Sequence, residues 1–406
     1  MRRWRLFASL VLTAASSSTV QLIHAGEPPP TACGYLARTM QMQRSGAVLL
    51  ASYPGVHSGP LSDAAFLYDN SVAAIALVAC GQLPQARRIG DALVLALDHD
   101  RYWHDGRLRN AYRAGAVSTG ALELAGWWDS KAQRWLEDRY QAGSDSGNVA
   151  WAMLALLTLY ANTGDERYRD GALRLARWVE SRVDTRGAGG FTGGDFGHEP
   201  TPQHLTWKST EHNTDLAAAF IWLERATADA HWQDRARVAQ RFVAAMWQAG
   251  GGYFAVGVAE DGVKVNPLLA LDAQIWPLMA LPGAVRQYGA ALATSERRLQ
   301  FDTGYTYSEA GGGLWSEGTA QVAVLLELLH REDAASALRA SLLTQRAADG
   351  GYFASDVAAT PTGFMLTTDP TQPRVYFHLE HLGAAAWAAL SEQRYNPFTG
   401  RSELPR

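Results

Sequence analysis

The sequence is short of charged residues, and this limits the partners it can have. Only 19% of the 406 residues are charged, the formal net charge is -4, and no basic run follows the first five residues. Nucleic acids and anionic membrane surfaces attract proteins with concentrated Lys and Arg. Neither is therefore expected as a partner.

Cysteine is scarcer still, and the motifs of common metal and cofactor sites are missing. Cys33 and Cys80 are the only cysteines, and the sequence leaves open whether they form a disulfide or remain buried thiols. No calcium loop, Walker loop, nucleophile elbow or HExxH motif occurs, and His378 and His381 stand three residues apart instead of four. We therefore expect neither a metal nor an organic cofactor.

Apolar runs long enough to form a membrane helix are absent as well. The run from Leu6 to Ala15 is too short to cross a bilayer. It follows an arginine-rich start and precedes Ile23-His24-Ala25-Gly26, a pattern typical of a secretory signal peptide. We expect a signal peptide over 1–25, and a mature bacterial protein that is periplasmic or secreted and has no membrane-inserted segment.

The remainder, 26–406, reads as a single helical domain. The hydrophobic content is 47%, and apolar residues recur at helical spacing. The pattern predicts about twelve helices, over 33–52, 64–80, 85–97, 148–162, 166–183, 211–228, 232–249, 270–281, 284–299, 316–330, 333–346 and 379–391. A glycine-aromatic turn recurs in three of the connecting loops, at Gly189-Gly190-Phe191, Gly251-Gly252-Tyr253-Phe254 and Gly350-Gly351-Tyr352-Phe353.

These helices alternate in character along the chain. The first member of each pair is apolar on all sides, and the second carries polar residues on one face. This predicts an all-α fold of six helical hairpins, with an inner ring of buried helices, an outer ring of amphipathic ones, and 33–52 as the outer partner of 379–391. The loops from outer to inner helices are long, so we expect function on their face of the ring.

Acidic residues recur at the N-termini of the expected inner helices. They occur in the motifs Tyr68-Asp69-Asn70, Asp145-Ser146-Gly147-Asn148, Lys208-Ser209-Thr210-Glu211-His212-Asn213, Leu271-Asp272-Ala273-Gln274-Ile275-Trp276, Trp315-Ser316-Glu317-Gly318-Thr319 and His378-Leu379-Glu380-His381. Helix capping explains any one of them. Asp69, Asp272 and Glu380, however, stand among apolar neighbours, where an unpaired carboxylate costs several kcal/mol. This favours one catalytic or ligand-binding cluster over six independent caps.

The arrangement resembles the (α/α)6 toroid of the six-hairpin glycosidase superfamily. The resemblance implies carbohydrate chemistry in a central cleft, although the superfamily also includes polysaccharide lyases, phosphorylases and sugar epimerases. We expect a glycoside hydrolase that acts on an oligo- or polysaccharide, with Glu211 as general acid, Asp272 as base, and Asp69 and Glu317 as the next candidates. Members of the superfamily often invert configuration, so we also expect a gap between acid and base that is wide enough for a water.

Other side chains at the helix mouths are expected to bind the sugar. They are His212, Asn213, Asp215, Tyr68, Asn70, Trp207, Gln274, Trp276, Trp315, Tyr305, Glu380 and His381. A lyase with His212, Tyr305 or Tyr307 as base is one alternative, disfavoured because the mouth motifs contain few arginines. A non-catalytic glycan-binding protein of an envelope polysaccharide system is the other. In each case we expect a carbohydrate ligand and a monomer.

Overall fold

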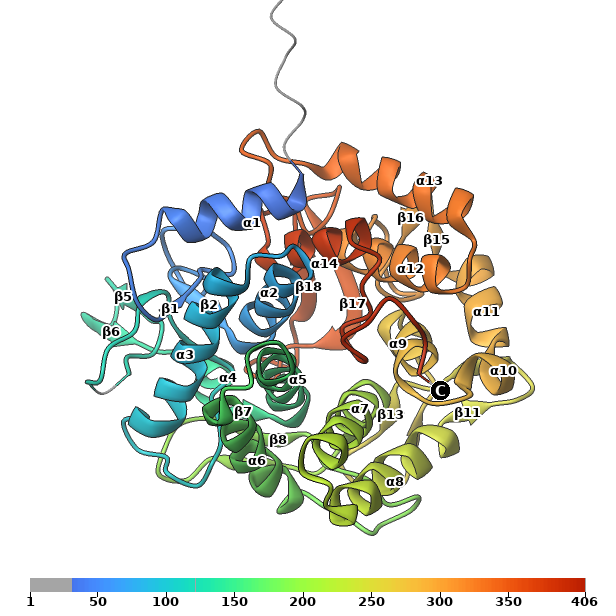
Figure 1. Cartoon of the computed structure of the whole chain (residues 1–406), viewed down its shortest axis with the longest axis horizontal. Helices are drawn as coiled ribbons and strands as arrows, with labels where there is room; N and C mark the ends of the chain where they lie inside the picture. Colours follow the sequence, from blue (N-terminus) through green and yellow to red (C-terminus); the bar gives the residue numbers. More distant parts are fainter. Residues whose placement is uncertain (1–30, 121, 406) are drawn as a thin grey trace, which may run out of the picture.

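Six inner helices form a closed ring in the computed structural model, which describes residues 31–120 and 122–405 (Figure 1). They are α2 (Leu67–Ala79), α5 (Ser146–Thr163), α7 (Thr210–Thr227), α9 (Asp272–Ala280), α12 (Ser316–Leu328) and α14 (Leu382–Glu392). Each contacts the next, and α14 contacts α2. The predicted signal peptide, 1–25, lies outside the described residues.

An outer layer covers this ring as the alternation of helices predicts. It consists of α3 (Leu83–His99), α6 (Glu166–Glu180), α8 (Ala230–Ala245), α10 (Ala284–Tyr288) with α11 (Ala290–Arg298), α13 (Glu332–Leu342) and α1 (Ala32–Gln41). Helix α1 packs against α14 and α2 and so completes the sixth hairpin. A short helix, α4 (Arg139–Ala142), and a 3-10 turn (Leu343–Gln345) complete the helical elements of the described residues.

Two expected helices differ from the prediction, and both differences occur near a glycine. The helix expected over 33–52 ends at Gln41, and the chain then turns through Gly46, whose φ of 96° lies outside the helical region. The helix expected over 284–299 is divided at Gly289 into α10 and α11.

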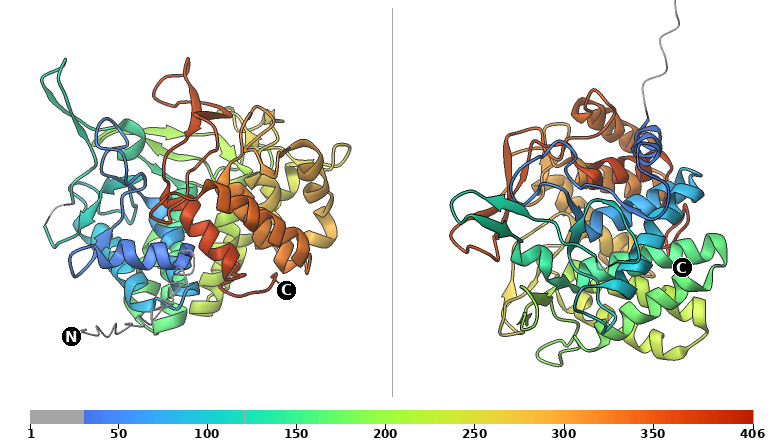
Figure 2. Two further views of the ribbon diagram at one scale, coloured as in Figure 1. Left: turned by 90° about the horizontal axis from the view of Figure 1, so that it is seen from above. Right: turned by 90° about the vertical axis from the view of Figure 1, so that its left-hand side faces the viewer.

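Short antiparallel strands, which the sequence did not predict, fill the loops. The pairs are β1 (Val48–Leu49) with β4 (Gly115–Ala116), β2 (Ala64–Phe66) with β3 (Ala111–Arg113), β5 (Trp127–Asp129) with β6 (Arg134–Leu136), β11 (Trp247–Gln248) with β12 (Tyr253–Phe254), β15 (Gln300–Phe301) with β16 (Gly304–Tyr305), and β17 (Ala359–Met365) with β18 (Pro373–Phe377). Two three-stranded sheets join β7 (Ser144–Asp145), β8 (Gly194–Phe196) and β9 (Gln203–Leu205), and β10 (Lys208–Ser209), β13 (Gly257–Val258) and β14 (Val265–Asn266). Strands β2, β7 and β10 run directly into inner helices, so this layer lies on the N-terminal face of the ring. Figure 2 shows hairpins β5–β6 and β17–β18 projecting on one side of the ring.

The opposite face of the ring is closed by the C-terminal segment. Phe398 is buried against Trp151 and Trp276, with ring centroids 5.1 and 5.7 Å away. Asn396 donates a hydrogen bond to the carbonyl of Met279 near the end of α9. The N-terminal face is therefore the side from which solvent reaches the ends of the inner helices.

The two cysteines form a disulfide. Cys33 in α1 is bonded to Cys80 at the end of α2, with Cα atoms 5.7 Å apart. Of the two alternatives that the sequence left open, the disulfide is the one present. It joins α1, the outer helix of the sixth hairpin, to α2, the first inner helix. None of the helices within residues 31–120 and 122–405 is both long and apolar enough to span a membrane.

Candidate active site

The first turns of the six inner helices lie on the N-terminal face, and at each of them stands an acid or a histidine. We call these side chains the first-turn cluster: Asp69 in α2, Asp145 before α5, Glu211 in α7, Asp272 in α9, Glu317 in α12 and His381 before α14. Helix N-termini favour anions, whereas burial favours neutral carboxyls. The protonation state of each member therefore depends on its own neighbours.

Glu211 and Asp272 form a hydrogen-bonded carboxyl pair. Burial, followed by the negative charge of Asp272, raises the pKa of Glu211 well above its usual range. Burial raises the pKa of Asp272 to about 6, while hydrogen bonds from the Ala273 amide, the Tyr307 hydroxyl and Glu211 limit that rise. Glu211 is thus the member that keeps its proton to higher pH, and Asp272 the member that ionises first.

The spacing of these carboxyls bears on the stereochemistry of the expected reaction. An inverting pair needs carboxyls about 6.5–9.5 Å apart to leave room for a water. In this structure the charge of Asp272 raises the pKa of Glu211, and an interaction with Glu211 lowers that of Asp272. The water-wide gap between acid and base stays a prediction.

On the other side of the ring, His381 lies between two buried carboxylates. Its Nε2 is 3.2 Å from Asp69 Oδ2, and its Nδ1 is 3.8 Å from Glu317 Oε2. The carboxylates raise the pKa of His381 against the effect of burial, and burial raises that of Glu317 to about 7. Gly383 leaves the space for this triad, since a Cβ there would stand 2.8 Å from Asp69 Oδ1 and from the His381 ring.

Tyr68 links this triad to three helices. Its hydroxyl donates a hydrogen bond to Glu317 Oε1 and accepts one of 2.8 Å from Trp387 Nε1. Gln321 also donates to Glu317 Oε1, whereas Glu317 Oε2 has no hydrogen-bond partner among the described residues. One oxygen of Glu317 is thus held by two hydrogen bonds, while the other is buried and lies 3.8 Å from His381 Nδ1.

Two further predicted residues of α7, His212 and Asp215, adjoin the carboxyl pair. His212 is partly exposed, and its Nδ1 lies 3.2 Å from Ser146 Oγ. Burial lowers the pKa of His212 to about 3, so its ring is neutral. Asp215, one turn below Glu211, has no exposed surface, and burial raises its pKa well above the usual range. It lies beneath the site, out of reach of a ligand.

Three amides predicted to bind sugar instead clamp the backbone of neighbouring loops. Asn213 bonds both the N–H and the C=O of Phe191. Gln274 does the same for Phe254, and Asn70 for Leu50. Because these contacts use both ends of each amide, the side chains hold the loops to the inner helices, and two of the loops contain the glycine-aromatic turn.

Of the three tryptophans predicted to bind sugar, one lies at the site and two lie in the core. Trp207 is partly exposed, with its ring centroid 5.3 Å from that of His212, and it remains a candidate for stacking on a sugar. Trp276 is 2% exposed and packs against Trp151 inside the ring. Trp315 is 1% exposed and packs against Tyr307. They therefore cannot present a face to a ligand.

Tyr305 and Glu380 lie away from the cluster. Tyr305 is buried, and the charged groups that affect its pKa are Glu296 and Arg331, not members of the cluster. Glu380 is half-buried near Asp349, whose charge adds to the effect of burial in raising its pKa. The sequence predicted a helix over 379–391 with Glu380 in its first turn. In the structure α14 begins at Leu382, and Glu380 instead pairs with Phe353 in an isolated β-bridge.

The sequence did not point to two residues of β18. Tyr376 lies with its ring centroid 5.6 Å from Tyr307 and 5.2 Å from Trp315. Arg374, two residues earlier, is exposed, and its charge acts on Glu211, Asp145 and Asp272. Both belong to the loop hairpin that ends just before the His378-Leu379-Glu380-His381 motif, and no sequence pattern marked them.

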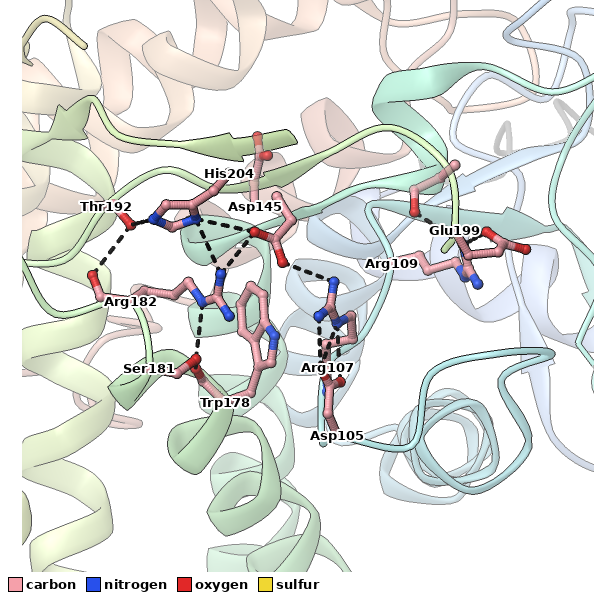
Figure 3. Close-up of polar contacts among 12 residues, drawn as sticks. Asp105, Arg107, Arg109, Asp145, Trp178, Ser181, Arg182, Thr192, Glu199 and His204 are labelled. Atoms are coloured by element: carbon pink, nitrogen blue, oxygen red, sulfur yellow. Dashed lines mark hydrogen bonds and ion pairs between the residues drawn. The ribbon is translucent and has the colours of Figure 1, made fainter. Parts of the chain in front are cut away.

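Buried ion pairs hold the long loops beside this face (Figure 3). Arg107 donates to Asp195 on β8 at 2.9 Å, and the fully buried Arg109 donates to Glu199 at 2.8 Å. Figure 3 shows Asp145 beside this network. The network fixes the loops that place Asp145, whose pKa burial raises to about 7. No group of three or more His, Cys, Asp or Glu side chains in the described parts of the chain is arranged to hold a metal ion.

Solved structures share this ring of hairpins. A glycosidase variant in complex with glucose superposes with a TM-score of 0.59 at 15% identity, covering 89% of this chain and 95% of that one. The chain has the (α/α)6 toroid fold of the six-hairpin glycosidases. The cellobiose 2-epimerase of Spirochaeta thermophila gives a TM-score of 0.62 at 13% identity, covering 89% of this chain and 93% of that one.

A GH76 alpha-mannanase of Bacteroides thetaiotaomicron gives a TM-score of 0.55 at 13% identity, covering 89% of this chain and 94% of that one. The sequence of this toroid matches no protein-family model and no curated protein. The predicted fold is therefore confirmed, whereas the reaction must be argued from the residues of the site.

Proposed function

We propose that the protein is a glycoside hydrolase that cleaves an oligo- or polysaccharide at the first-turn cluster. The observation that carries this proposal is the pair of neighbouring carboxyls at the first turns of α7 and α9, in which Glu211 keeps its proton to higher pH than Asp272. Glycoside hydrolysis needs such a pair of carboxyls whose environments separate their pKa values. Glycosidases among the proteins of similar fold support carbohydrate as the substrate class.

In the proposed reaction, the glycosidic oxygen replaces Asp272 as the acceptor of the hydrogen bond from Glu211. Glu211 transfers its proton to that oxygen as the bond to the anomeric carbon breaks. Water supplies the hydroxyl group of the new reducing end, and its remaining proton returns to a carboxylate. Asp272 takes the role of base here, and Glu317, which has one oxygen without a hydrogen bond, is the next candidate for it.

A polysaccharide lyase is the second candidate, and Arg374 is the observation that favours it. A lyase must neutralise a uronate carboxylate and remove a proton, and the guanidinium of Arg374 could do the first. The site offers no good base for the second step, the removal of a proton. The pKa of His212 is too low for an effective base, and burial raises that of Tyr307 well above its usual range.

We also infer that the protein is exported and acts in the periplasm or outside the cell. The disulfide between Cys33 and Cys80 supports this, because disulfides persist in oxidising compartments. A monomer remains our expectation.

The test is release of reducing sugar from a panel of neutral and acidic polysaccharides, with absorbance of unsaturated products recorded in parallel. We expect release by the wild type and a loss of at least a hundredfold in Glu211→Gln, since general acid catalysis contributes about 10²–10⁴-fold. Glu332→Gln is the matched control, because it removes the same carboxyl from the first turn of the outer helix α13. Unsaturated product would support the lyase. Glycan binding without any product would leave the protein as a binding module.

A further inference from the structure

Arg374 faces the first-turn cluster from the β17–β18 hairpin. It stands two residues before Tyr376 on β18, and alternate residues of a strand share a face. The Tyr376 ring packs on Tyr307 and Trp315, so that face of β18 is turned toward the cluster. Figure 1 shows β17 and β18 over the middle of the ring, and Figure 2 shows the hairpin standing on one side of it.

The guanidinium of Arg374 has no direct partner in the part of the chain that the structure describes. It makes no side-chain hydrogen bond there, and no carboxylate lies within 4.0 Å of it. Its charge nevertheless interacts electrostatically with the hydroxyls of Tyr140, Tyr376 and Tyr307 and with Glu211. Most arginines close to this face, such as Arg107 and Arg109, are instead fixed in ion pairs. Arg374 thus keeps all five of its donors available.

The carboxyls below Arg374 do not cancel its charge in full. Burial raises the pKa of Glu211 well above its usual range and that of Asp145 to about 7, which favours the neutral form of both. Asp272, whose pKa is raised only to about 6, interacts with Tyr307 and accepts a hydrogen bond from the Ala273 amide. A second anion placed between the guanidinium and the tyrosine hydroxyls would therefore meet more donors than competing charges.

We infer that Arg374 is a specificity-determining residue that binds an anionic group on the sugar, so that the substrate is an acidic oligosaccharide bearing carboxylate or sulfate. A planar guanidinium matches both groups through two parallel hydrogen bonds. The inference rests on the proposed function for the sugar ligand, and it adds the acidic substituent as the feature that the site selects.

The test measures binding by calorimetry to the full-length Glu211→Gln protein, which keeps the ligand uncleaved. The probes are tetragalacturonate and a hyaluronan tetrasaccharide for carboxylate, a carrageenan tetrasaccharide for sulfate, and cellotetraose and mannotetraose as neutral sugars. Arg374→Gln, Arg374→Lys and the control Arg241→Gln, which removes an exposed charge from the outer helix α8, are compared in that background.

We expect at least one acidic probe to bind at least tenfold more tightly than the neutral ones and to lose at least tenfold in Arg374→Gln. Arg374→Lys keeps the charge without the paired donors, so part of the affinity should remain. Arg241→Gln should change nothing. The two arms of acidic probes show whether carboxylate or sulfate is the group recognised.

Equal binding of neutral and acidic probes, no binding of any acidic probe, or unchanged acidic affinity in Arg374→Gln would overturn the inference. Its failure is distinguishable from that of the proposed function. Hydrolysis of a neutral polysaccharide without an Arg374 effect would keep the hydrolase and remove this inference. Binding of acidic probes through Arg374, with no bond cleaved by the wild type, would do the reverse.

Discussion

Replacing His381 by Gln should destabilise the protein by about 3–5 kcal/mol, because the buried Asp69 loses its cation. Asp69 is 3% exposed. At the observed separation of 3.2 Å, the attraction amounts to about 5 kcal/mol with an effective dielectric constant of about 20, whereas Glu317, whose pKa is raised to about 7, is largely neutral at pH 6. Desolvation of the ion pair offsets part of this attraction, but removing the cation leaves that cost uncompensated.

The measurement is urea unfolding of the wild type and the His381→Gln variant at pH 6, with His204→Gln as the control. His204 stands at the same 3.2 Å from a carboxylate, that of Asp195, but is 43% exposed, so its loss should cost less than about 1 kcal/mol. Adding Asp69→Asn to His381→Gln should recover part of the stability.

The pH dependence of stability follows from the raised pKa of His381. Its contribution is fully present below the unfolded value of about 6.5 and is lost as the pH rises through the raised folded value. The wild type should therefore lose more stability than His381→Gln between neutral and alkaline pH. Equal costs for the two histidine variants, or parallel pH profiles of the wild type and His381→Gln, would refute the role of His381 as a buried cation.

Three further outcomes are expected. Cys80→Ser should lower the free energy of unfolding by about 4 kcal/mol in oxidised protein, because the bond to Cys33 closes a loop of 47 residues, and the difference should vanish under reduction. Tyr307→Phe should raise the pKa of Asp272 further above about 6, which moves the acidic limb of the pH–rate profile to higher pH; an unmoved limb would show that Asp272 is not the ionisable group of that limb. Asn213→Ala should cost about 3 kcal/mol in chemical denaturation, since it leaves buried backbone groups unpaired, while a cost below about 1 kcal/mol would contradict the clamp.

The helical part of this fold could be predicted because its signals are local. Apolar periodicity depends on neighbouring residues, and apart from the helix expected over 33–52, which ends at Gln41, it located the inner and outer helices to within a few residues. The strands could not be predicted in the same way. Most contain only two or three residues and exist because segments distant in sequence pair, as β7 does with β8.

The site was predictable as a set of positions but not as a set of contacts. Acids at helix mouths indicated Glu211 and Asp272, yet their hydrogen bond depends on which inner helices become neighbours. Asn213 and Gln274 were assigned to the ligand because an amide at a helix mouth looks alike whether it holds a sugar or a loop. Arg374 was missed because a lone arginine in a loop has no sequence signature.

The central claim is that the first-turn cluster adds water across a glycosidic bond, with Glu211 as the proton donor. Mass spectrometry of the product formed from a cleaved glycan in oxygen-18 water tests it most directly. The account predicts one oxygen-18 atom for each bond cleaved, and product formation that falls at least a hundredfold in Glu211→Gln but not in Glu332→Gln. An unsaturated product without the label, or labelled product formed equally well by Glu211→Gln, would contradict it.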